Sequence, residues 1–241
     1  MFNQLNLAWQ KLTGAIDWLN DKLTSYRLML YFLLALLGWA IIGSFFNQVP
    51  YSWHQILVSV GWLLAICWLT NKIVPRFLDI PANKESDLIS ALILSFILSP
   101  PTTAHNFAIL AAAGVAAMAS KYVITIYKSH IFNPAATGAF IAGEVLHYYP
   151  SWWVGTKFMA PVVILGGILI MRKVKRFWMV TLFFAVYIAY QIYSAGHLEP
   201  GLLKLELLST PILFFGFVML TEPLTSPTTE NKYLPYAVLV G

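Results

Sequence analysis

Long uninterrupted runs of apolar residues decide what this chain can fold into. The chain is 59% hydrophobic and only 10% charged, whereas about a quarter of the residues of a soluble domain are charged. Several runs approach or exceed the ~18–20 residues that a helix needs to cross a bilayer. Because the runs are continuous rather than alternating, they exclude a transmembrane barrel and predict an all-α polytopic membrane protein.

Polar and proline-containing breaks divide the apolar sequence into about eight helices and a partial ninth. The eight expected segments are about 28–46, 56–74, 88–98, 107–126, 132–146, 158–171, 177–192 and 205–220. The third is short, and the ninth begins at Tyr233 and is cut off at Gly241. Before the first segment, residues 1–26 show the pattern of an amphipathic helix that lies on the membrane surface.

Two similar breaks indicate a repeat. Leu-Ser-Pro-Pro-Thr-Thr at 98–103 closes the third segment, and Leu-Thr-Glu-Pro-Leu-Thr at 220–225 closes the eighth, 122 residues later. The same offset places the first three segments on the sixth, seventh and eighth. Because five segments per unit is an odd number, we expect inverted repeats at 27–149 and 150–241. The second repeat is incomplete, which predicts that the chain belongs to a longer polypeptide.

Basic residues favour one side of the membrane. If the N-terminus is cytoplasmic, 13 of the 15 Lys and Arg residues lie on the cytoplasmic side, as the positive-inside rule expects. The outer connections instead carry aromatic residues. This asymmetry explains the net charge of +5 without a nucleic-acid partner. We expect a multi-pass protein of the plasma (inner) membrane.

Breaks inside the membrane are where a site is expected, because irregular backbone is tolerated there only against protein or water. Three breaks qualify, at 99–103, 133–138 and 221–229. In the second, Asn133 is expected to cap a helix with Pro134 at its first position. The helix start then offers N–H groups to a phosphate or a carbonyl, close to Lys121. Alternatively, the motif only starts a helix and the lysine only anchors it.

Small residues and carboxylates supply the other candidates. Alanine and glycine crowd the fourth and fifth segments, where they allow close helix packing or leave room for a flat cofactor. Intramembrane carboxylates are expensive, and Glu144 and Glu222 are the best candidates for a functional one. The single cysteine and the unpaired positions of the histidines predict no metal site.

Three sequence blocks resemble one membrane family. Lys121 and the Lys-Ser-His-Ile-Phe-Asn-Pro-Ala-Ala run at 128–136 resemble the Lys…Asn-x-Phe-Asn-Pro-Ala signature of that family. Its members are related membrane proteins of the sodium-translocating NADH:quinone reductase and of the Rnf electron-transport complex. Ser-Pro-Pro at 99–101 is similar to the family's Leu-Pro-Pro, and Met-Leu-Thr-Glu-Pro-Leu-Thr at 219–225 is similar to its Met-Ala-Thr-Asp-Pro-Val-Ser. The resemblance covers about 26–241.

The resemblance implies ten helices in two inverted repeats and a flavin-binding protein that passes electrons, often coupled to Na⁺ or H⁺ movement. Members carry FMN on a threonine of a Ser-Gly-Ala-Thr loop. This sequence has only Val-Gly-Thr-Lys at 154–157, so we expect FMN or riboflavin to bind non-covalently. The resemblance also implies other redox subunits, or a fused downstream reductase domain with FAD and NAD, fed by NAD(P)H or ferredoxin.

The flavin is expected between the helix start at 133–138 and the break at 221–229. Lys121 is expected to stabilise the reduced, anionic flavin, and Glu144 or Glu222 to take part in cation or proton coupling. The expected flavin contacts are Lys121, Asn133, Pro134, Thr137, Gly138, Thr221, Thr225, Ser226 and Thr228.

Two other functions fit the same pattern: an inverted-repeat transporter or channel without redox activity, and a membrane anchor that only docks a fused reductase.

Overall fold

The computed structural model describes residues 22–79, 85–126, 129–130, 132–195, 200–222, 225–227 and 229–240. Within these ranges, four helices are long and apolar enough to span a bilayer. They belong to α2 (Ser25–Phe45), α3 (Trp53–Leu78), α5 (Ala104–Val123) and α8 (Phe177–Ala195). The predicted helical membrane protein is confirmed to this extent. The surface helix expected at 1–26 lies almost wholly outside the described residues.

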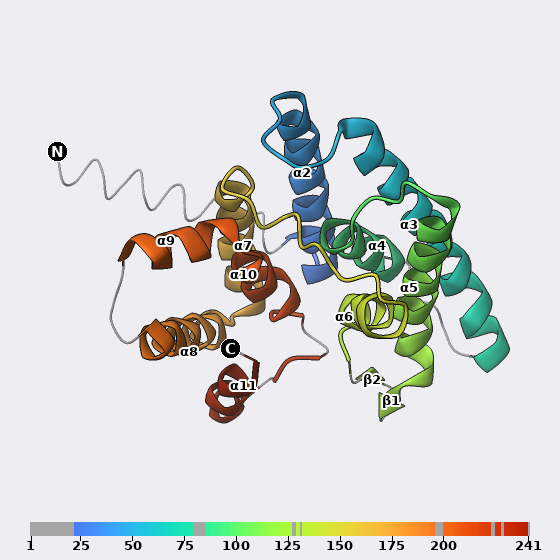
Figure 1. Cartoon of the computed structure of the whole chain (residues 1–241). Coiled ribbons are helices and arrows are strands. Elements are labelled where there is room, and N and C mark those ends of the chain that lie inside the picture. The colour runs from blue at the N-terminus through green and yellow to red at the C-terminus, as the bar shows by residue number, and fades with distance from the viewer. Residues whose placement is uncertain are drawn as a thin grey trace.

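The first half of the chain forms one group of packed helices (Figure 1). The short helix α4 (Ser86–Ile97) packs against α2 and α3, and α6 (Pro134–Phe140) packs against α4 and α5. The last turn of α6 continues into the π-helix η1 (Ile141–Val145). Two-residue strands, β1 (Thr125–Ile126) and β2 (Ser129–His130), form a small antiparallel pair before α6.

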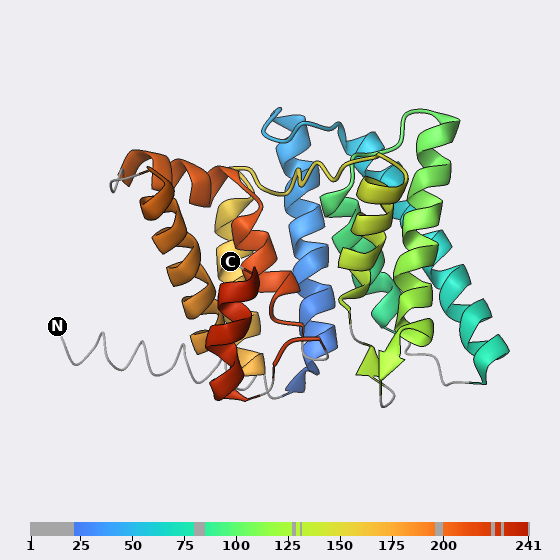
Figure 2. The same cartoon turned by 60° about the horizontal axis from the view of Figure 1, so that its bottom comes forward.

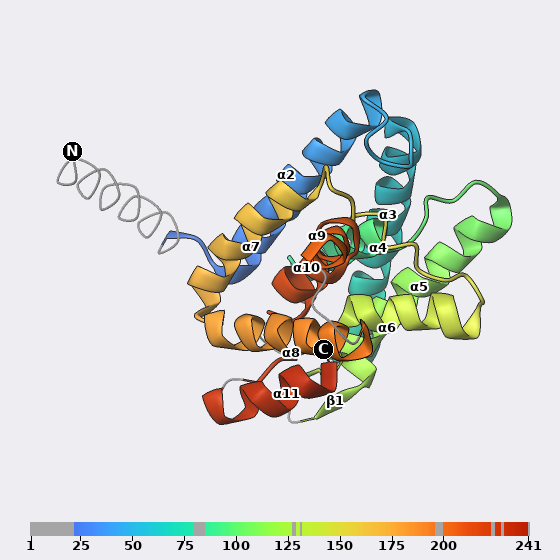
Figure 3. The same cartoon turned by 60° about the vertical axis from the view of Figure 1, so that its left-hand side comes forward.

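The second half begins with α7, which lies alongside α2 and joins the two halves (Figure 3). The π-helix η2 packs on α7, and α11 packs on α8. Together with α8, the described elements of this half are α7 (Ala160–Val174), α9 (Pro200–Ser209), α10 (Ile212–Phe214), η2 (Phe215–Met219), the 3-10 turn η3 (Glu230–Lys232) and α11 (Tyr233–Val240).

The segment expected as one helix at 205–220 is divided in the structure. It breaks at Thr210 and Pro211, between α9 and α10. Pro211 has no N–H to continue α9, and its carbonyl accepts from Phe215 N at 2.8 Å to begin the next helix. A Cβ at Gly155 would lie 2.5 Å from Pro211 N. The loop before α7 therefore packs directly on this break, and the expected single helix is wrong here.

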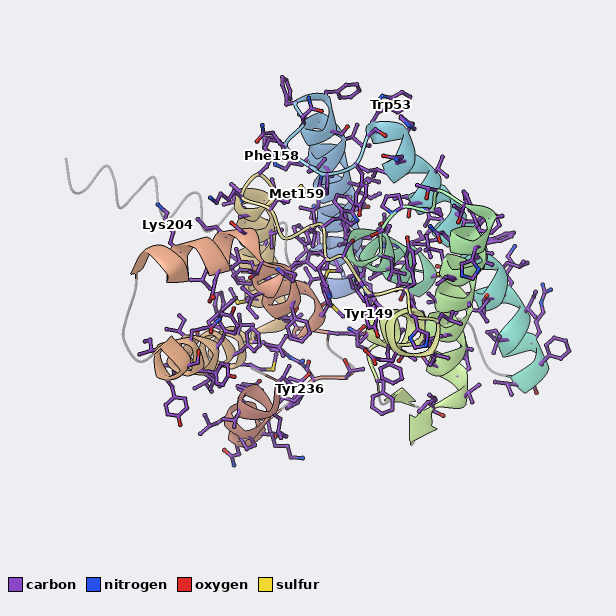
Figure 4. The ribbon with its side chains drawn as sticks, in the orientation of Figure 1. Trp53, Tyr149, Phe158, Met159, Lys204 and Tyr236 are labelled. Carbon is purple, nitrogen blue, oxygen red and sulfur yellow. The ribbon has the colours of Figure 1, made fainter. Side chains whose placement is uncertain are left out.

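Successive long segments run in opposite directions (Figure 2). The start of α2 and the ends of α3, α5 and α7 consequently share one end of the bundle, which we call the basic end. Arg27 lies there in the first turn of α2, and Arg76 and Lys173 lie there in the last turns of α3 and α7. At the opposite end, Phe158 precedes α7 (Figure 4) and stacks on Trp39 with ring centroids 4.8 Å apart.

At the opposite end, the break that follows α4 is closed by the loop between η1 and α7. Trp153 Nε1 donates to Ser95 O at 2.7 Å, and Trp152 N donates to Ile97 O at 2.9 Å. Tyr148 Oη donates to Ser99 O at 3.1 Å. The bonds to Ser95 and Ile97 satisfy carbonyls that the last turn of α4 leaves without a helical partner. We call this region the sealed break.

Replacing Trp153 by phenylalanine should lower the free energy of unfolding by about 1–2 kcal/mol, because it leaves the buried Ser95 carbonyl without its donor. The change in thermal unfolding midpoint of the purified protein in detergent measures the effect. Trp152→Phe is the control, since Trp152 contributes its backbone N–H to the sealed break. An equal loss in both variants would contradict the role given to the Trp153 indole.

Candidate functional site

A pocket lies near the basic end, where α2, α4, α7 and η2 meet the start of α6. It contains about 560 Å³ of empty space, part of it open to the surroundings. Aliphatic side chains form most of its walls. The polar residues that line it come from separate parts of the chain: Ser25, Tyr26, Ser86, Ser90, Asn133, Thr221 and Glu222.

The pocket brings together two of the three breaks at which a site was expected. Asn133 and Pro134 line it from the start of α6, and Thr221 and Glu222 line it from the end of η2. The third break follows the opposite end of α4 and is the sealed break. The structure therefore places the candidate site toward the basic end.

Lys121 lies in the last turn of α5 and directs its ammonium group to the first turns of α4. Its Nζ donates to Ser86 O at 2.8 Å, to Ser90 Oγ at 3.0 Å and also to Ser86 Oγ. The three protons of the ammonium thus meet three neutral oxygen atoms. Because Ser86 and Ser90 line the pocket, the positive charge lies directly behind its wall.

Asn133 caps α6 as the sequence predicts. Its side-chain oxygen accepts from Ala136 N at 3.0 Å, and Pro134 occupies the first position of the helix. A proline is tolerated there because the first N–H groups of a helix have no helical partner. The cap uses the amide oxygen of Asn133, so its two amide N–H donors remain for a ligand in the pocket.

Glu222 is held at the pocket by a turn that follows η2. Its backbone oxygen accepts from Ser226 N at 3.2 Å and from Ser226 Oγ at 2.5 Å. Its carboxylate Oε2 accepts from Thr225 Oγ1 at 3.0 Å. Thr221 donates its hydroxyl to Phe217 O, four residues earlier, at 2.7 Å. Thr225 and Ser226 therefore contact Glu222 but are not among the residues that line the pocket.

Arg176 also holds the backbone of Glu222. Only 6% of this arginine is exposed, and its Nη1 donates to Glu222 O at 3.3 Å. It follows Lys175, whose φ of 56° turns the chain sharply between α7 and α8. Burial lowers the pKa of Arg176, against the raising effect of Tyr233 and Tyr236, and the guanidinium still keeps its proton at neutral pH.

The remaining predicted residues do not line the pocket. Thr137 donates its hydroxyl to Asn133 O at 3.2 Å, and Gly138 lies against α5, where a Cβ would be 2.6 Å from Ala113 O. Glu144 is exposed in η1, toward the opposite end of the bundle from Asn133. Thr228 lies outside the described residues.

Ser86, Ser90, Tyr26 and Arg176 were not recognised from the sequence as parts of a site. The spacing of the two serines carried a usable signal, because polar residues four apart in an apolar helix share one face. Arg176 was counted only among the basic residues at the membrane surface. Its burial depends on contacts with Glu222 and α11, which no local pattern reveals.

Within the described ranges, no group of three or more His, Cys, Asp or Glu side chains is arranged to hold a metal ion. Comparison with known proteins adds no assignment: no protein-family model and no curated protein matches the sequence.

Proposed function

We propose that this chain is the membrane electron-transfer part of a redox-driven oxidoreductase complex, coupled to Na⁺ or H⁺ movement, and that its pocket holds a flavin. One observation carries the proposal. The pocket joins Asn133 and Glu222, from two of the sequence blocks that resemble the flavin-binding family, to the serines that bind Lys121. Residues far apart in the chain thus meet around one space.

The residues of the pocket fit a flavin ring. Aliphatic walls from α2, α4 and α7 suit the apolar part of the ring, and Ser86, Ser90 and Asn133 suit its polar edge. The carboxylate of Glu222 disfavours a phosphate group inside the pocket. This favours riboflavin, or FMN with its phosphate directed outward.

A bound flavin supplies the one- and two-electron chemistry that side chains lack. Lys121 places a positive charge behind the wall that Ser86 and Ser90 form, and so favours negative charge on a ligand there. Glu222 offers a carboxylate that can exchange a proton or attract a cation at the same pocket. The remaining wall is formed by the apolar side chains of Met29, Ile93 and Val218.

The proposal includes the inverted repeat. Packing in the two halves supports it: α4 packs on α2 as η2 packs on α7, and α5 packs on α3 as α11 packs on α8. The helices α2 and α7, the first of each proposed unit, pack on each other (Figure 3). With the basic end on the cytoplasmic side of the plasma membrane, the pocket opens toward the cytoplasm.

Purification of the protein in lipid nanodiscs tests the flavin. We expect bound flavin absorbance, and we expect denaturation to release all of it, since no covalent link is proposed. A preparation that contains no flavin, and that takes up neither added riboflavin nor FMN, would contradict the proposal.

A transporter without redox activity is the second candidate. It is favoured by the opposite charges of Lys121 and Glu222 on either side of a pocket formed by broken helices, an arrangement also found in inverted-repeat transporters. Flux measurements in liposomes without any redox partner separate the two functions. Selective solute transport under those conditions would favour the transporter.

A further inference from the structure

Two serines on one wall of the pocket share a single cation. Lys121 Nζ donates to Ser90 Oγ at 3.0 Å and also to Ser86 Oγ. Both serines belong to α4, where a spacing of four residues places them on one face of the helix, and both line the pocket. Only 5% of Ser90 is exposed. This wall therefore carries two hydroxyls whose oxygens are held by one ammonium group.

The bonds to Lys121 restrict where the serine protons can point. A serine hydroxyl has one proton of its own to donate, and a hydroxyl that accepts from an ammonium group cannot direct its proton at that group. Neither serine donates its proton to another residue in the described part of the chain. Because a buried donor without a partner costs about 1–3 kcal/mol, an acceptor is expected in the pocket that both residues line. The adjacent cation polarises the two hydroxyls and makes them stronger donors.

We infer that Ser86 and Ser90 make the pocket selective for the reduced state of its ligand. This inference rests on the proposed flavin. Full reduction of a flavin adds two electrons and, in mildly alkaline solution, one proton, so the ring gains one negative charge that its carbonyl oxygens share. Donors bind an oxygen more strongly as its negative charge rises. The two serines are then specificity-determining contacts, and Lys121 is a positioning residue that acts through them.

Variants of the serines isolate this contribution from the other charges at the pocket. Glu222 also lines the pocket and disfavours an anionic ligand, but it is present in every serine variant. After Ser90→Ala, Lys121 keeps the backbone oxygen and the hydroxyl of Ser86 as partners, and after Ser86→Ala it keeps that backbone oxygen and Ser90 Oγ. Each single variant thus removes one hydroxyl proton from the pocket and leaves the cation two acceptors.

Equilibrium dialysis of riboflavin against the protein in nanodiscs, freed of its own flavin, tests the inference. It is carried out without oxygen in mildly alkaline buffer, once with oxidised riboflavin and once with riboflavin reduced by dithionite. The selectivity is the dissociation constant of the oxidised form divided by that of the reduced form. We expect Ser86→Ala and Ser90→Ala each to lower this ratio about 3- to 10-fold, because each loses one hydrogen bond that is stronger in the reduced state. The reduction potential of the bound flavin should fall in the same variants.

Two further variants separate the hydroxyls from the fold. Ser86→Thr keeps a hydroxyl and should keep the wild-type ratio. Ser95→Ala is the matched control, because Ser95 also lies in α4 but donates to Leu92 O at 2.7 Å and does not line the pocket. Its ratio should stay at the wild-type value. Since the two serines of the pocket are replaced separately, one alanine variant decides the result if the other does not fold.

Unchanged ratios in the alanine variants would overturn the inference while leaving the flavin site intact. An equal loss of affinity for the two forms of riboflavin would also overturn it, because the serines would then bind the ring without regard to its charge. A wild-type protein that binds riboflavin in neither state, and that also purifies without flavin and takes up no FMN, would remove the proposed function and this inference together.

Discussion

Exchange of Lys121 for methionine should lower the affinity for flavin by about 100-fold while leaving the fold intact. Methionine has a similar length but no charge and no donor. Ser86 and Ser90 then lose the ammonium that orients their hydroxyls, and the pocket loses the positive charge behind its wall. A 100-fold change in affinity corresponds to about 2.7 kcal/mol, and it reflects the loss of the nearby positive charge and of the orientation of the two serine hydroxyls.

Lys121→Met should also lower the free energy of unfolding by about 1–3 kcal/mol, because Ser86 and Ser90 lose the donor that they share, while removal of the desolvation penalty of the buried charge offsets part of this loss. Titration with riboflavin and a thermal unfolding curve measure the two effects on one preparation. Lys72→Met is the matched control. Lys72 is exposed, with its Nζ 3.7 Å from the centre of the Trp68 ring. Unchanged flavin affinity in Lys121→Met would contradict the proposed role.

Valine at Gly138 is expected to destabilise the protein by about 3 kcal/mol, the upper part of the usual range for overpacking. A Cβ at this position would lie 2.6 Å from Ala113 O and 3.1 Å from Ala117 Cβ and Leu94 Cδ2. The first of these atoms belongs to the backbone of α5, so no side-chain rotation relieves the contact. The helix α6 must move away from α5 and carry Asn133 with it.

The control for this variant is Gly61→Val. Gly61 also lies inside a helix, and a Cβ there would meet nothing within 4 Å. Both substitutions change the intrinsic helix propensity equally, so their difference measures the steric contact alone. A thermal unfolding midpoint that falls equally in the two variants would show that α5 and α6 can separate freely.

Features set by neighbouring residues were predictable from the sequence. The cap at Asn133 and the proline after it follow from local backbone chemistry, and the structure begins α6 there. The short helix expected at 88–98 is observed at Ser86–Ile97, because its apolar run is bounded by polar residues on one side and prolines on the other.

Features set by distant contacts were not predictable in the same way. Pro211 is visible in the sequence, but a proline inside an apolar run can either kink a membrane helix or end it. Here Gly155, from another part of the chain, packs on the break and favours the second outcome. Ser86, Ser90 and Arg176 acquire their roles only when α5 and the turn after η2 meet them.

The hydrogen bonds of the sealed break also set the free-energy cost of opening that end of the bundle. To open that end of the bundle, the loop at 148–153 must leave the end of α4 and give up the bonds of Tyr148, Trp152 and Trp153 described above. At about 1 kcal/mol for each of three bonds, the open form would make up less than about one molecule in a hundred. A ligand that enters from the basic end therefore meets a closed far end almost all the time. Passage of a ligand from one end of the bundle to the other would be limited by how often the loop at 148–153 leaves the end of α4.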